Sequence, residues 1–154
     1  YIDPIFTITV SPQEFSSVSD LSSDFVWLFE DIYNYENGHD PWQEFGNNWP
    51  LSEILSLLNR YFEGVTKEMV LMNRRIEYDP ETDTIFYEGG RGGVPPERRV
   101  FDFKQNGNIL TLYYQLYNEE NGTIFEDRYY VLEIKLLEDG SFRYLSQKII
   151  ERKP

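Results

Sequence analysis

Apolar residues recur at three- and four-residue spacing in two segments of the N-terminal half. The first stripe consists of Leu21, Phe25, Leu28, Phe29 and Ile32. Ser and Asp residues precede this stripe and Asn37-Gly38 follows it, which is typical of helix ends. The second stripe follows Pro50, whose missing N–H suits the first position of a helix, and stops before Gly64. The two patterns predict helices over about residues 20–36 and 50–63.

The pattern then changes to short apolar runs that are separated by turn residues. MVLMNRRIEY and TIFYE lie on either side of Asp79–Asp83. This arrangement predicts a hairpin that joins strands at about 69–78 and 84–88. The first part of 69–78 also fits a helix.

Turn dipeptides recur at regular intervals in the last third of the chain. They are Asn106-Gly107, Asn121-Gly122 and Asp139-Gly140. Asn-Gly and Asp-Gly favour the positive backbone angles that two-residue hairpin turns need. The pattern therefore predicts an antiparallel meander with strands at about 99–105, 108–118, 123–137 and 141–151.

Side chains alternate between two faces of the predicted meander. One face carries Leu110, Leu112, Tyr114, Leu116, Tyr130, Leu132, Ile134 and Leu136. The opposite face carries mixed residues, among them Tyr113, Tyr117 and Tyr129. We expect the aliphatic face to be covered by the two helices.

These elements predict an α+β fold, with two N-terminal helices packed on a curved antiparallel β-meander. A length of 154 residues suits a single domain, 1–154. Residues 1–18 begin with an alternating IFTITV run and continue with Ser-Pro and further serines. We expect this segment to be a short strand, an ordered arm or a linker.

Charge is distributed unevenly along the chain, whose formal net charge is −13. Residues 1–59 contain ten acidic residues and no Lys or Arg, whereas residues 60–154 contain 17 acidic and 14 basic residues. The acidic half would repel phosphates and anionic lipid, so binding of nucleic acid or a membrane surface through it is disfavoured. Binding of a basic partner by the acidic half remains an alternative.

Cysteine is absent, which excludes disulfides, thiolate zinc sites and cysteine nucleophiles. The sequence contains no run of about 18 apolar residues, so it predicts no transmembrane segment. The sequence begins with Tyr1 instead of Met, which suggests that a leader was removed. We therefore expect an extracytoplasmic bacterial protein, secreted or attached through a lipid anchor upstream of Tyr1.

A glycine-rich segment, GGRGGVPPERR at 89–99, raises the question of phosphate binding. A phosphate-binding loop needs Gly-x-x-x-x-Gly-Lys-Ser/Thr followed by a helix. Here Pro95-Pro96 removes two N–H donors and a strand is expected next. The pattern favours a connecting loop, although Arg91, Arg98 and Arg99 could clamp a carboxylate or phosphate.

Catalytic and metal-binding patterns are not evident. His39 next to Asp40 could act as a base with an orienting acid, but the sequence contains no nucleophile motif for it. One imidazole also rarely suffices to bind a transition metal. Asp79–Asp83 resembles a calcium loop but Thr84 and Gly90 stand where the glycine and the last glutamate should be. We expect no cofactor, no metal and no enzymatic activity; a pocket with paired carboxylates stays open.

Aromatic residues are the remaining candidates for binding. Trp42 and Trp49 lie in the acidic half, and Tyr113, Tyr117 and Tyr129 should share one sheet face. Such rings, with charges nearby, can stack on sugars or bind protein partners.

The order of elements resembles that of NTF2-like and cystatin-like domains, in which a bent sheet wraps a helix. The C-terminal run YYVLEIKLLEDGSFRYLSQKI is also similar to the end of small extracytoplasmic lipoproteins of Gram-positive bacteria. The resemblance implies an accessory or binding domain and transfers no catalytic residue. Two hypotheses follow: a non-enzymatic domain that recognises a peptide, glycan or partner protein, or an acidic immunity-type inhibitor of a basic toxin or nuclease.

Overall fold

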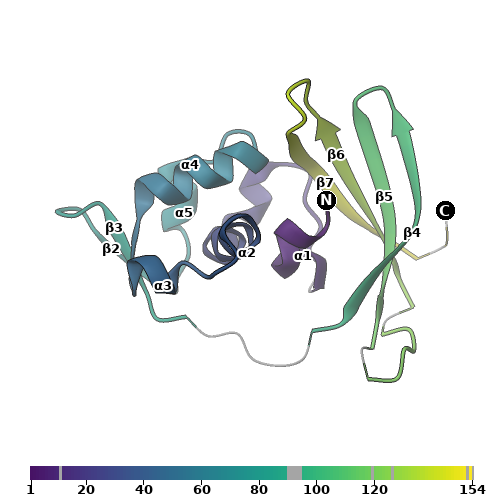
Figure 1. Cartoon of the computed structure of the whole chain (residues 1–154), viewed down its shortest axis with the longest axis horizontal. Helices are drawn as coiled ribbons and strands as arrows, with labels where there is room; N and C mark the ends of the chain where they lie inside the picture. Colours follow the sequence, from purple (N-terminus) through teal and green to yellow (C-terminus); the bar gives the residue numbers. More distant parts are fainter. Residues whose placement is uncertain (11, 90–94, 119, 126, 152, 154) are drawn as a thin grey trace. The chain divides into compact units, whose positions relative to one another are not determined.

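A computed structural model describes all residues except 11, 90–94, 119, 126, 152 and 154. The chain divides into two compact units (Figure 1). Unit 1 comprises Tyr1–Thr7 and Val18–Gly92, and unit 2 comprises Ile8–Ser17 and Gly93–Pro154. Helices and antiparallel sheets are both present, which confirms the α+β class. The packing of the two N-terminal helices on the meander stays a prediction.

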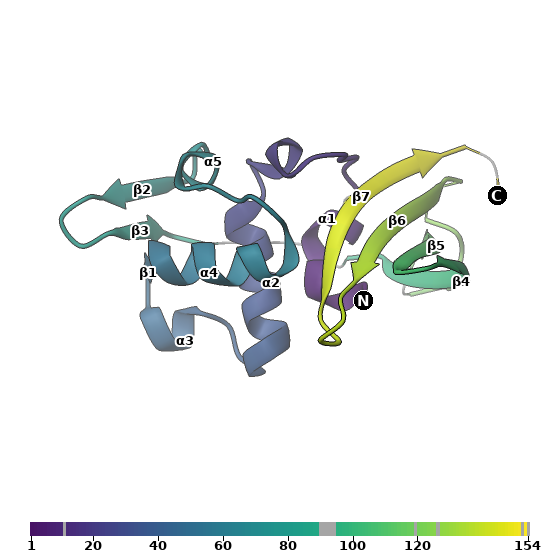
Figure 2. The same ribbon diagram turned by 90° about the horizontal axis from the view of Figure 1, so that it is seen from above.

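The two predicted helices correspond to α2 (Phe25–Asn37) and α4 (Leu51–Tyr61), which pack against each other in unit 1 (Figure 2). Helix α2 begins later than expected because Val18–Leu21 forms a separate 3-10 turn, η2. It ends as predicted: Gly38 is left-handed, with φ 73°, and its N–H donates to the Asn34 carbonyl. Both helices bury their apolar stripes, and each fully buried large side chain contributes roughly 1.5–3 kcal/mol.

Residues 1–18 contain helical turns where we expected a strand, arm or linker. The turn η1 (Asp3–Ile5) leads into α1 (Phe6–Val10). Ile5 and Ile8 are both buried, and this three-residue spacing fits a helix as well as the alternating run fitted a strand. Pro4 supports the helical start because its φ is already fixed near the helical value.

Unit 1 also contains a three-stranded sheet. Its strands are β1 (Asn48–Pro50), β2 (Ile76–Asp79) and β3 (Thr84–Tyr87), in the order β1-β3-β2. The hairpin predicted around Asp79–Asp83 is therefore confirmed. The strand is shorter than 69–78 because α5 (Lys67–Leu71) occupies the first part, as the helical alternative allowed. Thr66 caps α5 by accepting a hydrogen bond from the Met69 N–H.

A short helix, α3, and the residue that precedes α4 complete the description of unit 1. Helix α3 (Trp42–Phe45) follows Pro41. Pro50 has extended backbone angles and precedes α4 as its N-cap, one position earlier than predicted. Within the described residues, no helix has both the length and the apolar composition needed to cross a membrane.

Unit 2 contains the predicted antiparallel meander. Its strands are β4 (Glu97–Asn106), β5 (Ile109–Tyr117), β6 (Tyr129–Leu136) and β7 (Phe142–Ile150), in the order β4-β5-β6-β7. The three turn glycines, Gly107, Gly122 and Gly140, all have positive φ. The alternation is confirmed for Leu110, Leu112, Tyr114, Leu116, Tyr130, Leu132 and Ile134, which are buried. Leu136, at the end of β6, is only half-buried.

The third strand of the meander is shorter than the predicted 123–137. A turn does form at Asn121-Gly122, where the Gly122 N–H donates to the Asn118 carbonyl. Ile124 then makes one isolated bridge with Tyr117, but the regular ladder of β6 begins only at Tyr129. The turn dipeptide thus marked the reversal of the chain and not the start of the strand.

Gln147 connects β7 to the N-terminal segment of unit 2. Its side chain is fully buried and donates to the carbonyls of Ile8 and Gln13, at 2.7 and 2.9 Å. It also accepts a 2.8 Å hydrogen bond from the Tyr114 hydroxyl. Its backbone exchanges two hydrogen bonds with Phe15. A buried polar group is costly unless its partners are satisfied, so these bonds fix the segment against the sheet.

We predict that Gln147→Leu destabilises the protein by about 2–4 kcal/mol, because the Tyr114 hydroxyl and two backbone carbonyls would lose their partner. Urea unfolding followed by the near-UV signal of the tyrosines measures the change. Gln105→Leu is the matched control, because Gln105 is exposed and donates only to the Gly107 carbonyl. Equal stability of the two variants would contradict the assigned role of Gln147.

Candidate functional site

The sheet of unit 2 has a buried face and an open face, and the open face carries a group of aromatic rings. We call Phe101, Tyr113, Tyr117 and Tyr129 the aromatic face. The ring of Phe101 lies 5.7 Å from that of Tyr129 and 6.5 Å from that of Tyr113, between ring centroids. Three of these rings were predicted from the alternation along β5 and β6. Phe101 was missed because a bulge between Val100 and Asp102 shifts the register of β4.

Cationic side chains lie over the rings of the aromatic face. The guanidinium of Arg99 is 4.3 Å from the centroid of Tyr117, and the ammonium of Lys104 is 5.2 Å from that of Tyr113. The ammonium of Lys153 is 5.4 Å from the centroid of Phe101. Cations favour the negative faces of aromatic rings, so these contacts order the long side chains over the sheet.

Arg99 also pairs with a carboxylate on the same strand. Its Nη2 lies 2.7 Å from Oε2 of Glu97. The hydrogen bond from Arg99 lowers the pKa of Glu97 below its ordinary value and keeps the carboxyl ionised. The open face therefore presents aromatic, cationic and anionic groups side by side. This arrangement suits a partner that carries both charged and apolar side chains.

Strand β4 forms one edge of this sheet (Figure 1). Every β4 residue except Arg98 is exposed, and within the described chain β4 pairs only with β5. Val100 and Phe103 oppose Tyr114 and Leu112 on the buried-face side of the register, yet they are 44% and 64% exposed. An exposed edge of this length presents unpaired backbone N–H and C=O groups together with apolar side chains.

The opposite edge, β7, is partly covered by the chain itself. Phe15 bridges Gln147, and the Ile149 N–H donates to the carboxylate of Glu14 at 2.9 Å. The two edges therefore differ: β7 has partners from residues 14–15, whereas β4 pairs only with β5 among the strands that the structure describes.

Arg98 and Arg99, two of the three arginines that could clamp a carboxylate or phosphate, lie on opposite faces of the sheet. Arg98 opposes Leu116 and its Nη1 donates to the Thr9 hydroxyl at 3.0 Å, so it belongs to the buried face. Arg99 belongs to the open face, as described above. Arg91 lies outside the described residues. Adjacent residues of a strand point to opposite faces, so Arg98 and Arg99 cannot act on one ligand from the same side of the sheet.

The predicted tryptophans belong to the core of unit 1. Trp49 is fully buried, and its ring centroid lies 5.0 Å from that of Trp42 and 5.4 Å from that of Phe29. Trp42 is half-buried and stacks on Tyr87 at 5.4 Å. These rings thus pack with each other in the aromatic core of unit 1.

The first glycine of the glycine-rich segment packs against this cluster. Gly89 has φ 77°, and a Cβ atom at this position would lie 2.5 Å from Cζ2 of Trp42. Only glycine fits this close approach. Part of the segment therefore has a structural role, while residues 90–94 lie outside the described residues.

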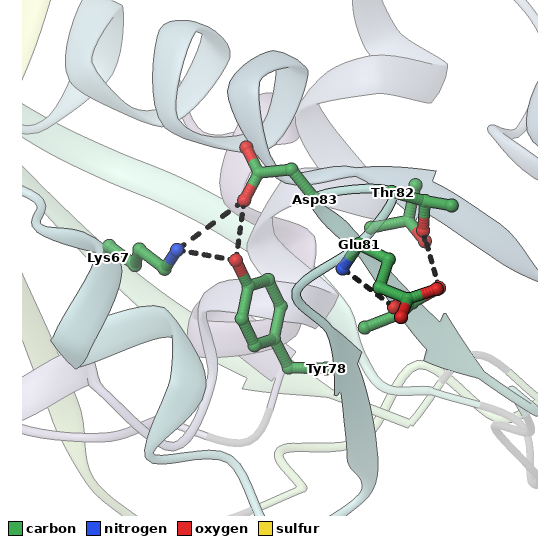
Figure 3. A network of polar contacts seen from close by, with 7 residues as sticks. Lys67, Tyr78, Glu81, Thr82 and Asp83 are labelled. Atoms are coloured by element: carbon green, nitrogen blue, oxygen red, sulfur yellow. Dashed lines mark hydrogen bonds and ion pairs between the residues drawn. The ribbon is translucent and has the colours of Figure 1, made fainter.

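A polar network joins Lys67, Tyr78 and Asp83 at the β2–β3 hairpin (Figure 3). The Tyr78 hydroxyl donates to Oδ1 of Asp83 at 2.7 Å, and Nζ of Lys67 donates to the Tyr78 oxygen at 2.5 Å. The hydrogen bond from Tyr78, followed by that from Lys67, lowers the pKa of Asp83. These exposed or half-exposed contacts tie α5 to the tip of the hairpin, which accounts for them without catalysis.

The loop that resembles a calcium site uses its carboxylate for the turn. Asp79 accepts hydrogen bonds from the Glu81 N–H at 2.9 Å and the Thr82 hydroxyl at 2.7 Å. These bonds lower its pKa. Among the residues that the structure describes, no group of three or more His, Cys, Asp or Glu side chains could hold a metal ion.

His39 is engaged in contacts within unit 1. Its Nδ1 lies 3.2 Å from the Asp40 carbonyl, and its ring meets that of Tyr33 edge-on at 5.8 Å. The Tyr33 hydroxyl donates to the Glu44 carboxylate. Burial and this hydrogen bond raise the pKa of Tyr33 to about 12. The tyrosine therefore stays protonated, and the arrangement connects α2 with α3.

Comparisons with protein-family models, with curated proteins and with solved structures give no match. The NTF2-like and lipoprotein resemblance therefore stays a prediction.

We predict that the carboxyl groups of Asp79 and Asp83 titrate below the unfolded value of about 3.9. A lowered folded-state pKa contributes stability that is present above the unfolded pKa and is lost as the pH falls through the folded pKa. Carbon-13 NMR titration of the two carboxyls measures this directly. The same two carboxyls in the urea-unfolded chain are the reference. A pKa of Asp79 or Asp83 at or above 3.9 would contradict the network.

Proposed function

We propose that the protein is a non-enzymatic, extracytoplasmic binding domain that recognises an extended segment of a partner protein. The observation that carries this proposal is the exposed ten-residue edge strand β4 beside the aromatic face. The arrangement of the two N-terminal helices on the meander and the NTF2-like or cystatin-like resemblance belong to the same proposal.

The mechanism is addition of a strand to β4. An extended peptide beside an exposed edge gains main-chain hydrogen bonds, and its alternate side chains meet the two faces of the sheet. Strand β7 is less suited because Phe15 and Glu14 already use part of its edge. A peptide is preferred to a glycan because sugars cannot use the unpaired backbone groups in this regular way.

The side chains along β4 define the sequence that such a segment should have. On one side it would meet Val100 and Phe103, which favour apolar residues. On the other side it would meet Arg99 and Lys104 next to the aromatic face, which favour acidic or aromatic residues. The partner segment therefore alternates apolar residues with acidic or aromatic ones.

The charge difference between the units supports this location. Unit 1 contains sixteen acidic and five basic residues, whereas unit 2 contains eleven acidic and nine basic residues. An acidic segment is thus repelled less by unit 2 than by unit 1.

The same charge difference supports a second candidate, the acidic immunity-type inhibitor. Unit 1, with its excess of eleven negative charges, would then face a basic toxin or nuclease. Sub-nanomolar, salt-sensitive binding to the product of a neighbouring toxin gene would favour this candidate. A lipid-acceptor Cys directly upstream of Tyr1 would favour the extracytoplasmic domain instead.

We predict that selection of ten-residue peptides from a random display library enriches alternating apolar and acidic or aromatic sequences. Phe103→Ala should weaken binding of a selected peptide about tenfold, the size of effect that an exposed aromatic anchor gives at an interface. Binding is measured by fluorescence anisotropy with the full chain.

Tyr35→Ala is the matched control, because Tyr35 is a similarly exposed aromatic residue of unit 1. Its affinity should stay within about twofold of the parent protein. Arg99→Glu with Lys104→Glu should remove the preference for acidic residues. Selected peptides that bind Phe103→Ala as tightly as the parent protein would exclude β4 as the site.

A further inference from the structure

Unit 1 contains a pocket of about 370 Å³ between the start of α2 and the segment that follows α5. Its volume lies within the range of small-ligand sites, roughly 300–1,000 Å³. The two walls are joined by Asn73, which is buried and whose amide donates to the Ser23 carbonyl at 3.0 Å. Asn73 also accepts a hydrogen bond from the Arg75 N–H at 2.9 Å, which holds the segment after α5 in place.

The lining of the pocket includes a buried carboxylate. Asp24 is 8% exposed, and its Oδ2 accepts a hydrogen bond from the Ser23 hydroxyl at 3.0 Å. Its Oδ1 has no hydrogen-bond partner in the part of the chain that the structure describes, and its side chain does not cap α2. Burial raises the pKa of Asp24. A ligand that supplies a positively charged donor here would compensate the buried charge.

The lining also includes two exposed arginines. Neither Arg74 nor Arg75 forms an ion pair with a carboxylate among the described residues, although unit 1 contains sixteen acidic residues. The guanidinium of Arg75 lies 4.9 Å from the ring centroid of Trp27, so it is ordered by an aromatic face and keeps its N–H donors. An anionic group could accept hydrogen bonds from these guanidinium groups.

Two apolar residues also line the pocket. Trp27 is half-buried, and its orientation is fixed by a 2.6 Å hydrogen bond from Nε1 to the Tyr87 hydroxyl. Met72 is 67% exposed, and its flexible side chain can adapt to a ligand in the pocket. An apolar side chain of a ligand could cover both residues.

The volume of the pocket restricts the size of the ligand. About 370 Å³ lies within the range of sites for drug-sized ligands, roughly 300–1,000 Å³. Such ligands are larger than a single amino acid. A di- or tripeptide therefore fills the pocket better than a single amino acid.

We propose that this pocket binds a short zwitterionic peptide of two or three residues. The ammonium group binds Asp24, the carboxylate binds Arg74 or Arg75, and an apolar side chain packs on Trp27 and Met72. This site lies wholly in unit 1 and is independent of the strand-addition function proposed for unit 2.

Isothermal titration calorimetry with the dipeptide leucyl-phenylalanine tests the proposal on the full chain. We expect millimolar or tighter binding, and a loss of about tenfold or more when the peptide is N-acetylated or C-amidated. Free leucine should bind more weakly than the dipeptide. Absence of dipeptide binding at about 10 mM, or equal binding of the N-acetylated peptide, overturns the proposal.

Two variants assign the contacts. Asp24→Asn keeps the size of the side chain and an acceptor for Ser23 while it removes the buried charge, so the fold is retained and dipeptide affinity falls about tenfold or more. Asp20→Asn is the matched control, because Asp20 is exposed in η2 and is not part of the pocket. Equal affinity of the Asp24→Asn protein and the parent would overturn the proposal.

Discussion

An antiparallel sheet must either cover or expose the backbone groups of its two edge strands, and unit 2 treats its edges differently. On β7, the buried Gln147 satisfies Tyr114 and two carbonyls of the N-terminal segment, while Phe15 pairs with its backbone. On β4, the described chain supplies no second strand. This difference determines which edge can accept a partner, and the proposed function depends on it.

Much of this fold could be predicted from local sequence signals. Turn glycines such as Gly107 and Gly140 require positive φ, and the alternation along β5 and β6 follows from a period of two. Contacts between distant segments could not be predicted in this way. The attachment of Phe15 depends on Gln147, which lies more than 130 residues away in the sequence. The helix at Phe6–Val10 was missed because the spacing of its apolar residues fits the period of a strand as well as that of a helix.

The candidate site was predicted in part, for the same reason. Tyr113, Tyr117 and Tyr129 share the open face because they alternate along regular strands. Phe101 joins them only through a bulge, which has no clear signal in the sequence. Trp42 and Trp49, which were predicted as binding candidates in the acidic half, pack against each other within unit 1. The sequence does not separate these two roles, because aromatic side chains serve cores and binding surfaces equally well.

Amide hydrogen exchange, followed residue by residue with and without a selected strand-forming peptide, tests the central claim most directly. The account predicts that amides on the free side of β4 exchange rapidly in the free protein and become protected in the complex. The amides of Gln147 and Ile149 on β7 should be protected in both states. Protection of the whole of β4 before the peptide is added, or unchanged exchange in β4 after it binds, would contradict strand addition at this edge.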